Sequence, residues 1–150
     1  MSHTFTKLTV HSVFGTKDRR ELITPPLQAR LYPYMMEVLN DGFGLAREIG
    51  GAADHTHMLF DLNRDRSVAE CMRQVKSVSS GWVRATFPDL RHFGWQEGYG
   101  AFSVSSPRME MVADYIRTQE EHHKKRSFEQ EFRALLDKYG VQYDPQFLWK

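Results

Sequence analysis

Residues 52–62, AADHTHMLFDL, alternate between polar and apolar side chains in the manner of a half-buried β-strand. Because successive side chains of a strand point to opposite faces, His55, His57, Leu59 and Asp61 share one face. The opposite face carries Thr56, Met58, Phe60 and Leu62, and we expect it to be the core side. The stretch therefore predicts a strand with two imidazoles on its non-core face, about 7 Å apart at Cα.

The segments before this strand indicate a mixed α and β domain. They are a strand within residues 4–16, a helix that begins at Thr24 and Pro25, and a short strand over 45–49. Pro33 falls inside the helix and is predicted to kink or divide it. Gly50 and Gly51 are predicted to begin the turn into the histidine strand, so that the two strands form a hairpin.

The segments after the histidine strand complete the order. Capping boxes at Ser67 and Ser127 each begin a helix, and between them lie an aromatic strand within 94–105 and a helix from Ser106 to about residue 124. The first six elements match the ferredoxin-like split βαβ arrangement, an RRM-like α+β fold in which both helices cover one face of an antiparallel sheet. Two C-terminal helices are added. We expect the second face of the sheet to be free for a partner or ligand.

The composition is that of one globular domain, which we take to span residues 1–150. The chain is 41% hydrophobic and 26% charged, with a net charge of +1, so any nucleic-acid binding must come from local patches. No apolar run approaches the roughly 20 residues of a membrane helix, and the polar start does not resemble a signal peptide, which predicts a cytoplasmic protein. The single cysteine, Cys71, is predicted to be a small core residue.

Two features of the sequence can carry chemistry. His55 and His57 can converge on one metal ion, although the same spacing fits two surface histidines. Tyr115 and Gln119 are neighbours one helical turn apart, although a tyrosine in an apolar stripe is usually a core residue. Together the imidazoles and the amide oxygen form a three-ligand set with positions open for phosphate oxygens, and Asp61 is a rival third ligand.

The order of these motifs resembles a known family. HTHMLF at 55–60 is followed by GYGAFSVS at 98–105, YIRTQ at 115–119 and QEEHHKK at 119–125. This series is similar to that of the single-tyrosine HUH transposases, which mobilise insertion sequences as single-stranded DNA and include relatives associated with repetitive extragenic palindromes. The likeness extends from HSVFGTKDRRELI at 11–23 to the terminal FLW.

The resemblance implies a role for each site residue. His55, His57 and Gln119 would hold Mg²⁺ or Mn²⁺, and Tyr115 would attack the scissile phosphate to form a 5′-phosphotyrosine. It further implies single-stranded DNA with hairpin ends as substrate, no nucleotide triphosphate, and a homodimer in which the tyrosine helix of one subunit can serve the histidine pair of the other. Thr56 departs from the bulky hydrophobic residue that the family places between the histidines, and we expect a packing cost on the core side with the metal face intact.

Other residues are candidates for supporting roles. His122 could help to remove the proton of Tyr115, although solvent or the metal could suffice. The basic clusters are Lys17, Arg19 and Arg20; Arg73, Lys76 and Arg84; and Lys124, Lys125 and Arg126. Each cluster could be a solvated face, and from them we select Lys76, Arg84, Arg73 and Lys124 as candidate DNA contacts. Trp82 and Trp95 are either base-stacking platforms or core residues.

Two other classes of protein compete with a tyrosine transposase. One is a non-catalytic or domesticated single-stranded nucleic-acid-binding protein of the same fold. The aromatic RNA-binding pattern of RRM domains is absent from both LTVHSVFG at 8–15 and HTHMLFDL at 55–62, which argues against it. The other is a metal-dependent phosphodiesterase that uses water in place of the tyrosine.

Overall fold

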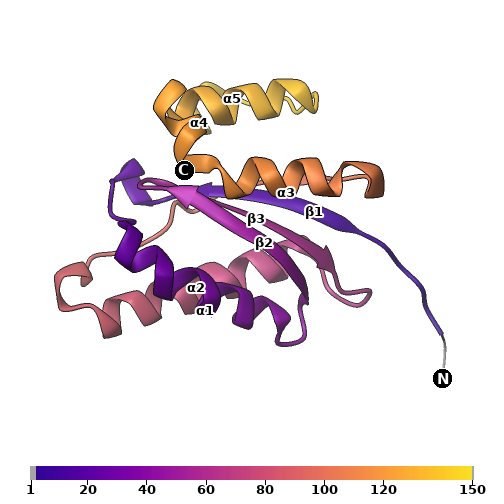
Figure 1. Ribbon diagram of the computed structural model, residues 1–150, viewed down its shortest axis with the longest axis horizontal. Coiled ribbons are helices and arrows are strands. Elements are labelled where there is room, and N and C mark those ends of the chain that lie inside the picture. The colour runs from indigo at the N-terminus through magenta and orange to yellow at the C-terminus, as the bar shows by residue number, and fades with distance from the viewer. Residues whose placement is uncertain (1–2, 150) are drawn as a thin grey trace.

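A computed structural model, which describes residues 3–149, shows a four-stranded antiparallel sheet between two layers of helices (Figure 1). The strands are β1 (Thr9–Gly15), β2 (Gly44–Ala52), β3 (His55–Leu62) and β4 (Gly100–Ser103), in the spatial order β2-β3-β1-β4. The helices are α1 (Pro25–Asn40), α2 (Val68–Thr86), α3 (Met109–Arg117), α4 (Gln119–Lys125) and α5 (Phe128–Lys138). Single 3-10 turns lie at Lys17–Arg19, Pro88–Leu90, Ser106–Arg108 and Pro145–Phe147. The predicted α+β arrangement, with a split βαβ sheet and added C-terminal helices, is confirmed.

The first face of the sheet packs on α1 and α2. Phe14 and Phe60 are fully buried there, together with Met58, and they form one cluster with the apolar stripes of both helices. The helix starts predicted at Thr24 and Ser67 hold, because the Thr24 side chain caps α1 and Ser67 forms a capping box with Glu70. Helix α1 continues through Pro33 without being divided.

The second face of the sheet is covered, and the expectation of a free face is wrong. Figure 1 shows α3, α4 and α5 lying across it. Val13 and Phe102 of the sheet pack with Phe128 and Phe132 of α5, and Leu59 packs with Ile116 of α3. The physical reason is that α3 and α5 are amphipathic, so each must bury an apolar stripe, and the sheet offers the surface.

The two glycines of β2 lie inside a strand, so the prediction that they begin the turn is also wrong. A Cβ on Gly50 would lie 2.2 Å from the carbonyl oxygen of Ile116, and a Cβ on Gly51 would lie 2.2 Å from that of His55. These glycines therefore permit a close backbone approach, of α3 in the case of Gly50. The turn of the hairpin lies at residues 53–54.

The helix predicted from 106 to about 124 starts later and is interrupted: residues Ser106–Arg108 form a 3-10 turn, and α3 begins at Met109. Thr118, with φ −105° and ψ 28°, separates α3 from α4, and its hydroxyl donates to the carbonyl oxygen of Asp114 at 2.9 Å. Tyr115 therefore belongs to α3 and Gln119 begins α4. Cys71 is buried in the first cluster, as predicted. Within residues 3–149, none of the helices is long and apolar enough to cross a membrane.

Candidate metal and tyrosine site

Strand β3 directs both histidines of the HTH motif toward the helices on the second face. The rings of His55 and His57 are 1% and 0% exposed, and their centroids lie 5.1 Å apart. The Nε2 atom of each ring lies 3.1 Å from Oε1 of Glu131, and Nε2 of His55 lies 2.9 Å from Oε1 of Gln119. The structure thus brings the predicted pair together with the predicted amide, and it adds a carboxylate.

The other nitrogen of each ring is held by a side chain behind it. Nδ1 of His55 lies 2.7 Å from Oδ1 of Asp54, and Nδ1 of His57 lies 2.7 Å from Nε2 of His11 on the neighbouring strand. A metal-binding histidine typically uses its second nitrogen in this way, which fixes the orientation of the ring and its tautomer. Both Nε2 atoms are therefore turned toward the same point.

The four side chains that meet at this point suit a divalent cation. Adjacent ligands about 2.1 Å from an octahedral ion are about 3.0 Å apart, and the three donor separations here are 2.9, 3.1 and 3.1 Å. The same lengths are hydrogen bonds, through which the side chains hold one another. Imidazole nitrogens together with amide and carboxylate oxygens form a mixed donor set. Mn²⁺ binds both kinds of donor well, whereas Mg²⁺ binds mainly the oxygens.

Tyr115 lies beside this donor set and is half-buried. Its hydroxyl donates to Oε2 of Glu131, and Nη2 of Arg126 donates to the phenol oxygen at 3.3 Å. Burial and the negative charge of Glu131 raise the pKa of Tyr115 to about 12, against the opposing hydrogen bond of Arg126. The phenol is therefore protonated at neutral pH, and its proton must leave during any attack on phosphorus.

A cavity of about 210 Å³ opens next to this phenol. Tyr115, His11, Arg126, Lys138 and Tyr139 contribute side chains with polar groups to its lining, and Val112, Ala134 and Leu135 complete it. Arg126 and Lys138 thus place two cations beside the phenol.

The candidate proton acceptor lies beside the Tyr115 ring with its Nε2 engaged by another residue, and the rival ligand lies further along β3. The ring of His122 is 4.6 Å from that of Tyr115, but its Nε2 lies 3.1 Å from the hydroxyl of Thr118. Asp61 is two pleats from His57, where it accepts hydrogen bonds from Arg47 and from Lys7 at 2.9 Å, so it is not a third ligand at this point.

Glu131 was missed by sequence reasoning. It is 3% exposed and comes from α5, where it shares the buried face with Phe128 and Leu135. Burial raises the pKa of its carboxyl group, but the hydrogen bonds from His55 and His57 outweigh this and hold the pKa well below its usual range. A glutamate in the apolar stripe of a capped helix was the available signal, because buried carboxylates are rare without partners.

Two of the predicted DNA contacts have partners within the chain. Nζ of Lys76 donates to the carbonyl oxygens of Glu97 and Gly98 at 2.7 and 2.9 Å, and Nη1 of Arg84 donates to that of Phe93 at 2.9 Å. These two cations brace the segment that leads into β4, and burial lowers the pKa of Lys76 to about 8.

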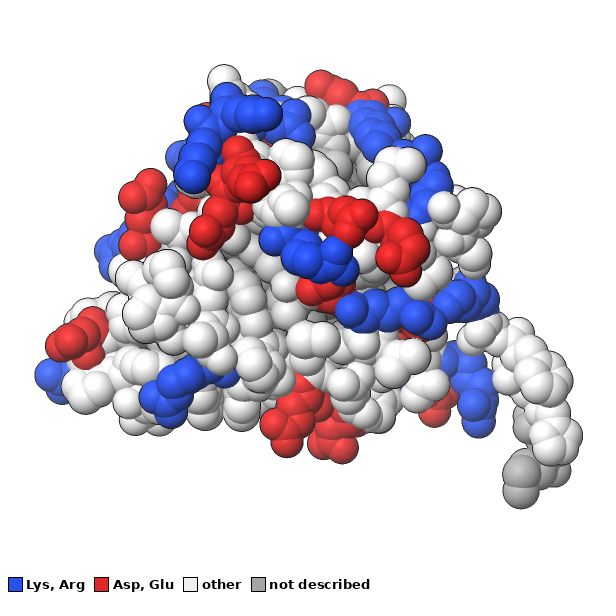
Figure 2. All heavy atoms as spheres, viewed as in Figure 1, with Lys and Arg blue, Asp and Glu red and all other residues white. Residues whose placement is uncertain are grey.

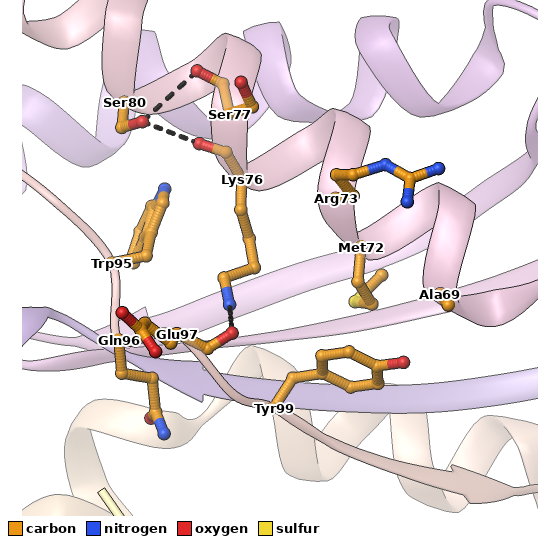
Figure 3. A pocket seen from close by; sticks show the side chains of 10 residues that line it. All are labelled: Ala69, Met72, Arg73, Lys76, Ser77, Ser80, Trp95, Gln96, Glu97 and Tyr99. Atoms are coloured by element: carbon orange, nitrogen blue, oxygen red, sulfur yellow. Dashed lines mark hydrogen bonds between the residues drawn. The ribbon is translucent and has the colours of Figure 1, made fainter. Parts of the chain in front are cut away.

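Figure 3 shows Lys76 in a pocket of about 320 Å³ between α2 and this segment, with Arg73 and Tyr99 at its wall. Arg73 and Lys124 are exposed. On the face shown in Figure 2, blue and red side chains are interspersed, and a blue group covers the region where α4 meets α5. On this face the cations are therefore local groups within a mixed surface.

Neither predicted stacking residue has a freely exposed ring. Trp95 is 8% exposed, and its Nε1 donates to Oγ of Ser79 at 2.9 Å. Trp82 is half-buried and stacks on Tyr34 with ring centroids 4.6 Å apart. Both rings serve packing in this structure.

The chain is similar to proteins of known family and fold. The family model "Transposase IS200 like" matches residues 4–119. A crystal structure of a candidate transposase from Deinococcus radiodurans R1 has a TM-score of 0.65 and 18% identity, over 77% of this chain and 93% of that one. A REP-associated tyrosine transposase bound to a REP hairpin has a TM-score of 0.55 and 18% identity, over 77% of this chain and 68% of that one. Among curated proteins, no sequence matches this chain.

Proposed function

Because this chain belongs to the IS200-like transposase family, we propose that it cleaves and rejoins single-stranded DNA through a covalent 5′-phosphotyrosine at Tyr115. One observation carries the proposal: the Tyr115 phenol donates to Glu131, and the same carboxylate contacts both His55 and His57. Gln119 completes the donor set through its contact with His55. Chain segments more than 50 residues apart supply these groups, and all of them converge on the face of the sheet away from the main core.

The side chains divide the chemistry between them. His55, His57 and Gln119 would hold Mg²⁺ or Mn²⁺, which when bound supplies Lewis-acid polarisation of the scissile phosphate. The Tyr115 oxygen forms a bond to phosphorus as the bond to the 3′-oxygen breaks. The phenol gives up its proton to solvent and the departing 3′-oxygen takes one up, so the products are a 5′-phosphotyrosine and a free 3′-OH. A second 3′-OH reverses the step on a new strand. One phosphodiester replaces another, so no nucleotide triphosphate is consumed.

The protein supplies positioning for this reaction. Arg126 donates to the phenol oxygen and lines the adjacent cavity with Lys138, so the pair can bind the phosphodiester and stabilise the charge that builds up during transfer. Exposed Arg73 and Lys124 would contact the DNA backbone further out. The substrate is proposed to carry hairpin ends, because the REP-associated relative is bound to such a hairpin.

The assembly and location of the protein form part of the same proposal. Residues 1–150 act as one HUH-type domain in the cytoplasm, and two copies form a homodimer. Tyr115 lies beside the histidine pair of its own chain in this structure. In the dimer the tyrosine helix could serve either pair.

The test is covalent capture of DNA. Protein incubated with labelled single-stranded hairpin DNA and Mn²⁺ should yield an adduct that survives a denaturing gel, and Tyr115→Phe should abolish it. Tyr34→Phe is the matched control, because that phenol stacks on Trp82 on the other side of the sheet. Cleavage by Tyr115→Phe at full yield would refute the tyrosine mechanism in favour of a water-using phosphodiesterase. DNA binding without an adduct under any metal would favour the non-catalytic or domesticated binding protein.

A further inference from the structure

We propose that Glu131 is a fourth ligand of the ion and that its second oxygen positions the Tyr115 phenol. The inference rests on the proposed function, since it concerns the same site. It goes further in assigning the ion a carboxylate ligand from α5, a helix that lies beyond the residues matched by the family model.

The position of Glu131 is that of a ligand. Its Oε1 lies 3.1 Å from Nε2 of His55 and 3.1 Å from Nε2 of His57, so it faces both imidazoles at once. Those are the nitrogens left available after Asp54 and His11 have taken the Nδ1 atoms. An ion bound by the two Nε2 atoms therefore has this carboxylate oxygen as its nearest anionic donor.

Charge gives a second argument. Two imidazoles and an amide are neutral ligands, yet His55, His57 and Gln119 are each no more than 1% exposed. Removing a divalent cation from water into such a site is costly unless opposite charge accompanies it. Glu131 is the carboxylate that touches both rings, and it supplies that charge.

The carboxylate is held rigidly enough to act as a ligand. A capping box at Ser127 and Gln130 fixes the first turn of α5, which contains Glu131. Phe128 of the same turn stacks on the His55 ring with centroids 4.3 Å apart and an interplanar angle of 6°. Helix α5 therefore packs directly against the HTH motif, and this packing sets the position of Glu131.

The remaining oxygen links the ion site to the nucleophile. Oε2 of Glu131 accepts the hydrogen bond of the Tyr115 hydroxyl, while Oε1 faces the histidines. One carboxylate thus sets the distance between the ion and the attacking oxygen. Such positioning matters because transfer to phosphorus depends on alignment of the reacting atoms.

Manganese affinity measured without DNA tests this inference separately from catalysis. Free Mn²⁺ is followed by electron paramagnetic resonance during titration of the full chain, of Glu131→Gln and of Glu129→Gln. Glu129 is on the same helix but is partly exposed and pairs with Arg19 and Arg133, so it controls for loss of one negative charge. We expect Glu131→Gln to weaken Mn²⁺ binding by about tenfold or more, and Glu129→Gln to change it less than about twofold.

Unchanged or tighter Mn²⁺ binding by Glu131→Gln would overturn the proposal. The carboxylate would then not be a ligand and would only lie where a phosphate of the DNA substrate binds. If Glu131→Gln does not fold, a Mn²⁺-soaked crystal of the unmodified protein decides: an anomalous peak within about 2.3 Å of Oε1 supports the ligand, and a peak remote from it refutes it. Loss of Mn²⁺ affinity in Glu131→Gln, with no covalent DNA adduct from the unmodified protein, would uphold the ligand and refute the transposase chemistry.

Discussion

Replacing Gly50 with alanine should push the tyrosine helix away from the sheet. The added Cβ would lie 2.2 Å from the carbonyl oxygen of Ile116, whereas Cβ atoms in proteins essentially never approach closer than 3.0 Å. The gap must therefore open by about 0.8 Å. Overpacking of this kind costs about 1–3 kcal/mol of folding free energy, or about 2–12 °C in Tm for a chain of this size.

The same shift should impair cleavage more than it impairs folding. Ile116 adjoins Tyr115, and Gly50 is paired with His57 across the sheet, so the opening separates Tyr115 from the histidine pair. Misplacement by about 1 Å can cost about 100-fold in rate. We therefore expect adduct formation under single-turnover conditions to fall by about that factor at a temperature where Gly50→Ala is fully folded.

Gly81→Ala on α2 is the matched control for Gly50→Ala. Apart from the backbone of the helix itself, the atom nearest to the added Cβ would be Nη2 of Arg84 at 3.9 Å, so the methyl group fits. Replacing a helical glycine with alanine should raise the free energy of unfolding by about 0.5–1 kcal/mol. Thermal unfolding and adduct rates are measured for both variants. If Gly50→Ala kept the Tm and the rate of the unmodified protein, the close approach of α3 to β2 would be refuted.

Three further perturbations probe other parts of the structure. Asp61→Asn should cost about 1 kcal/mol at pH 7 in urea unfolding, because hydrogen bonds from Arg47, Thr9 and Lys7 hold the pKa of this carboxyl group well below its usual range. The stabilisation is present above the usual pKa of an aspartate, about 4, and is lost as the pH falls below it, so an undiminished difference at about pH 3 would contradict the assignment. His11→Leu should weaken Mn²⁺ binding about tenfold, because it removes the partner of Nδ1 of His57. His11→Gln can still accept that hydrogen bond and should retain most of the Mn²⁺ affinity. Equal Mn²⁺ affinities of the two variants would show that His11 does not orient His57. Lys76→Met should lower the free energy of unfolding by about 1–2 kcal/mol, because it leaves two carbonyl oxygens unpaired. Arg73→Gln should leave the free energy of unfolding unchanged. It should reduce the slope of log affinity for DNA against log salt concentration by about one unit between about 50 and 200 mM salt.

Local patterns predicted much of the fold. The alternation of residues 55–62 placed both histidines on the face away from the main core, where they lie, and Thr56 on the core side, where its hydroxyl lies 3.2 Å from that of Tyr32. The capping boxes at Ser67 and Ser127 both form. These features depend on neighbours within four residues or on a two-residue period, which a single sequence displays.

The errors concern packing between distant segments. Gly50 and Gly51 look like a turn in isolation, because the sequence does not display the close approach to Gly50 of α3, more than 60 residues later. Glu131 likewise has its partners more than 70 positions earlier, at His55 and His57. The break at Thr118 belongs to the same class, since it lets α4 turn Gln119 toward His55. No local period encodes these contacts.

The proximity of Tyr115 and the histidine pair within one chain has a consequence for subunit mixing. A chain that cuts with its own tyrosine works at a rate per molecule that does not depend on dilution. A mixture of Tyr115→Phe and His55→Ala chains would then stay inactive, because neither holds a complete set of groups. Restored activity in such a mixture would require that chains exchange their tyrosine helices. Complementation between two inactive variants therefore measures how often the arrangement within one chain gives way to an arrangement between two.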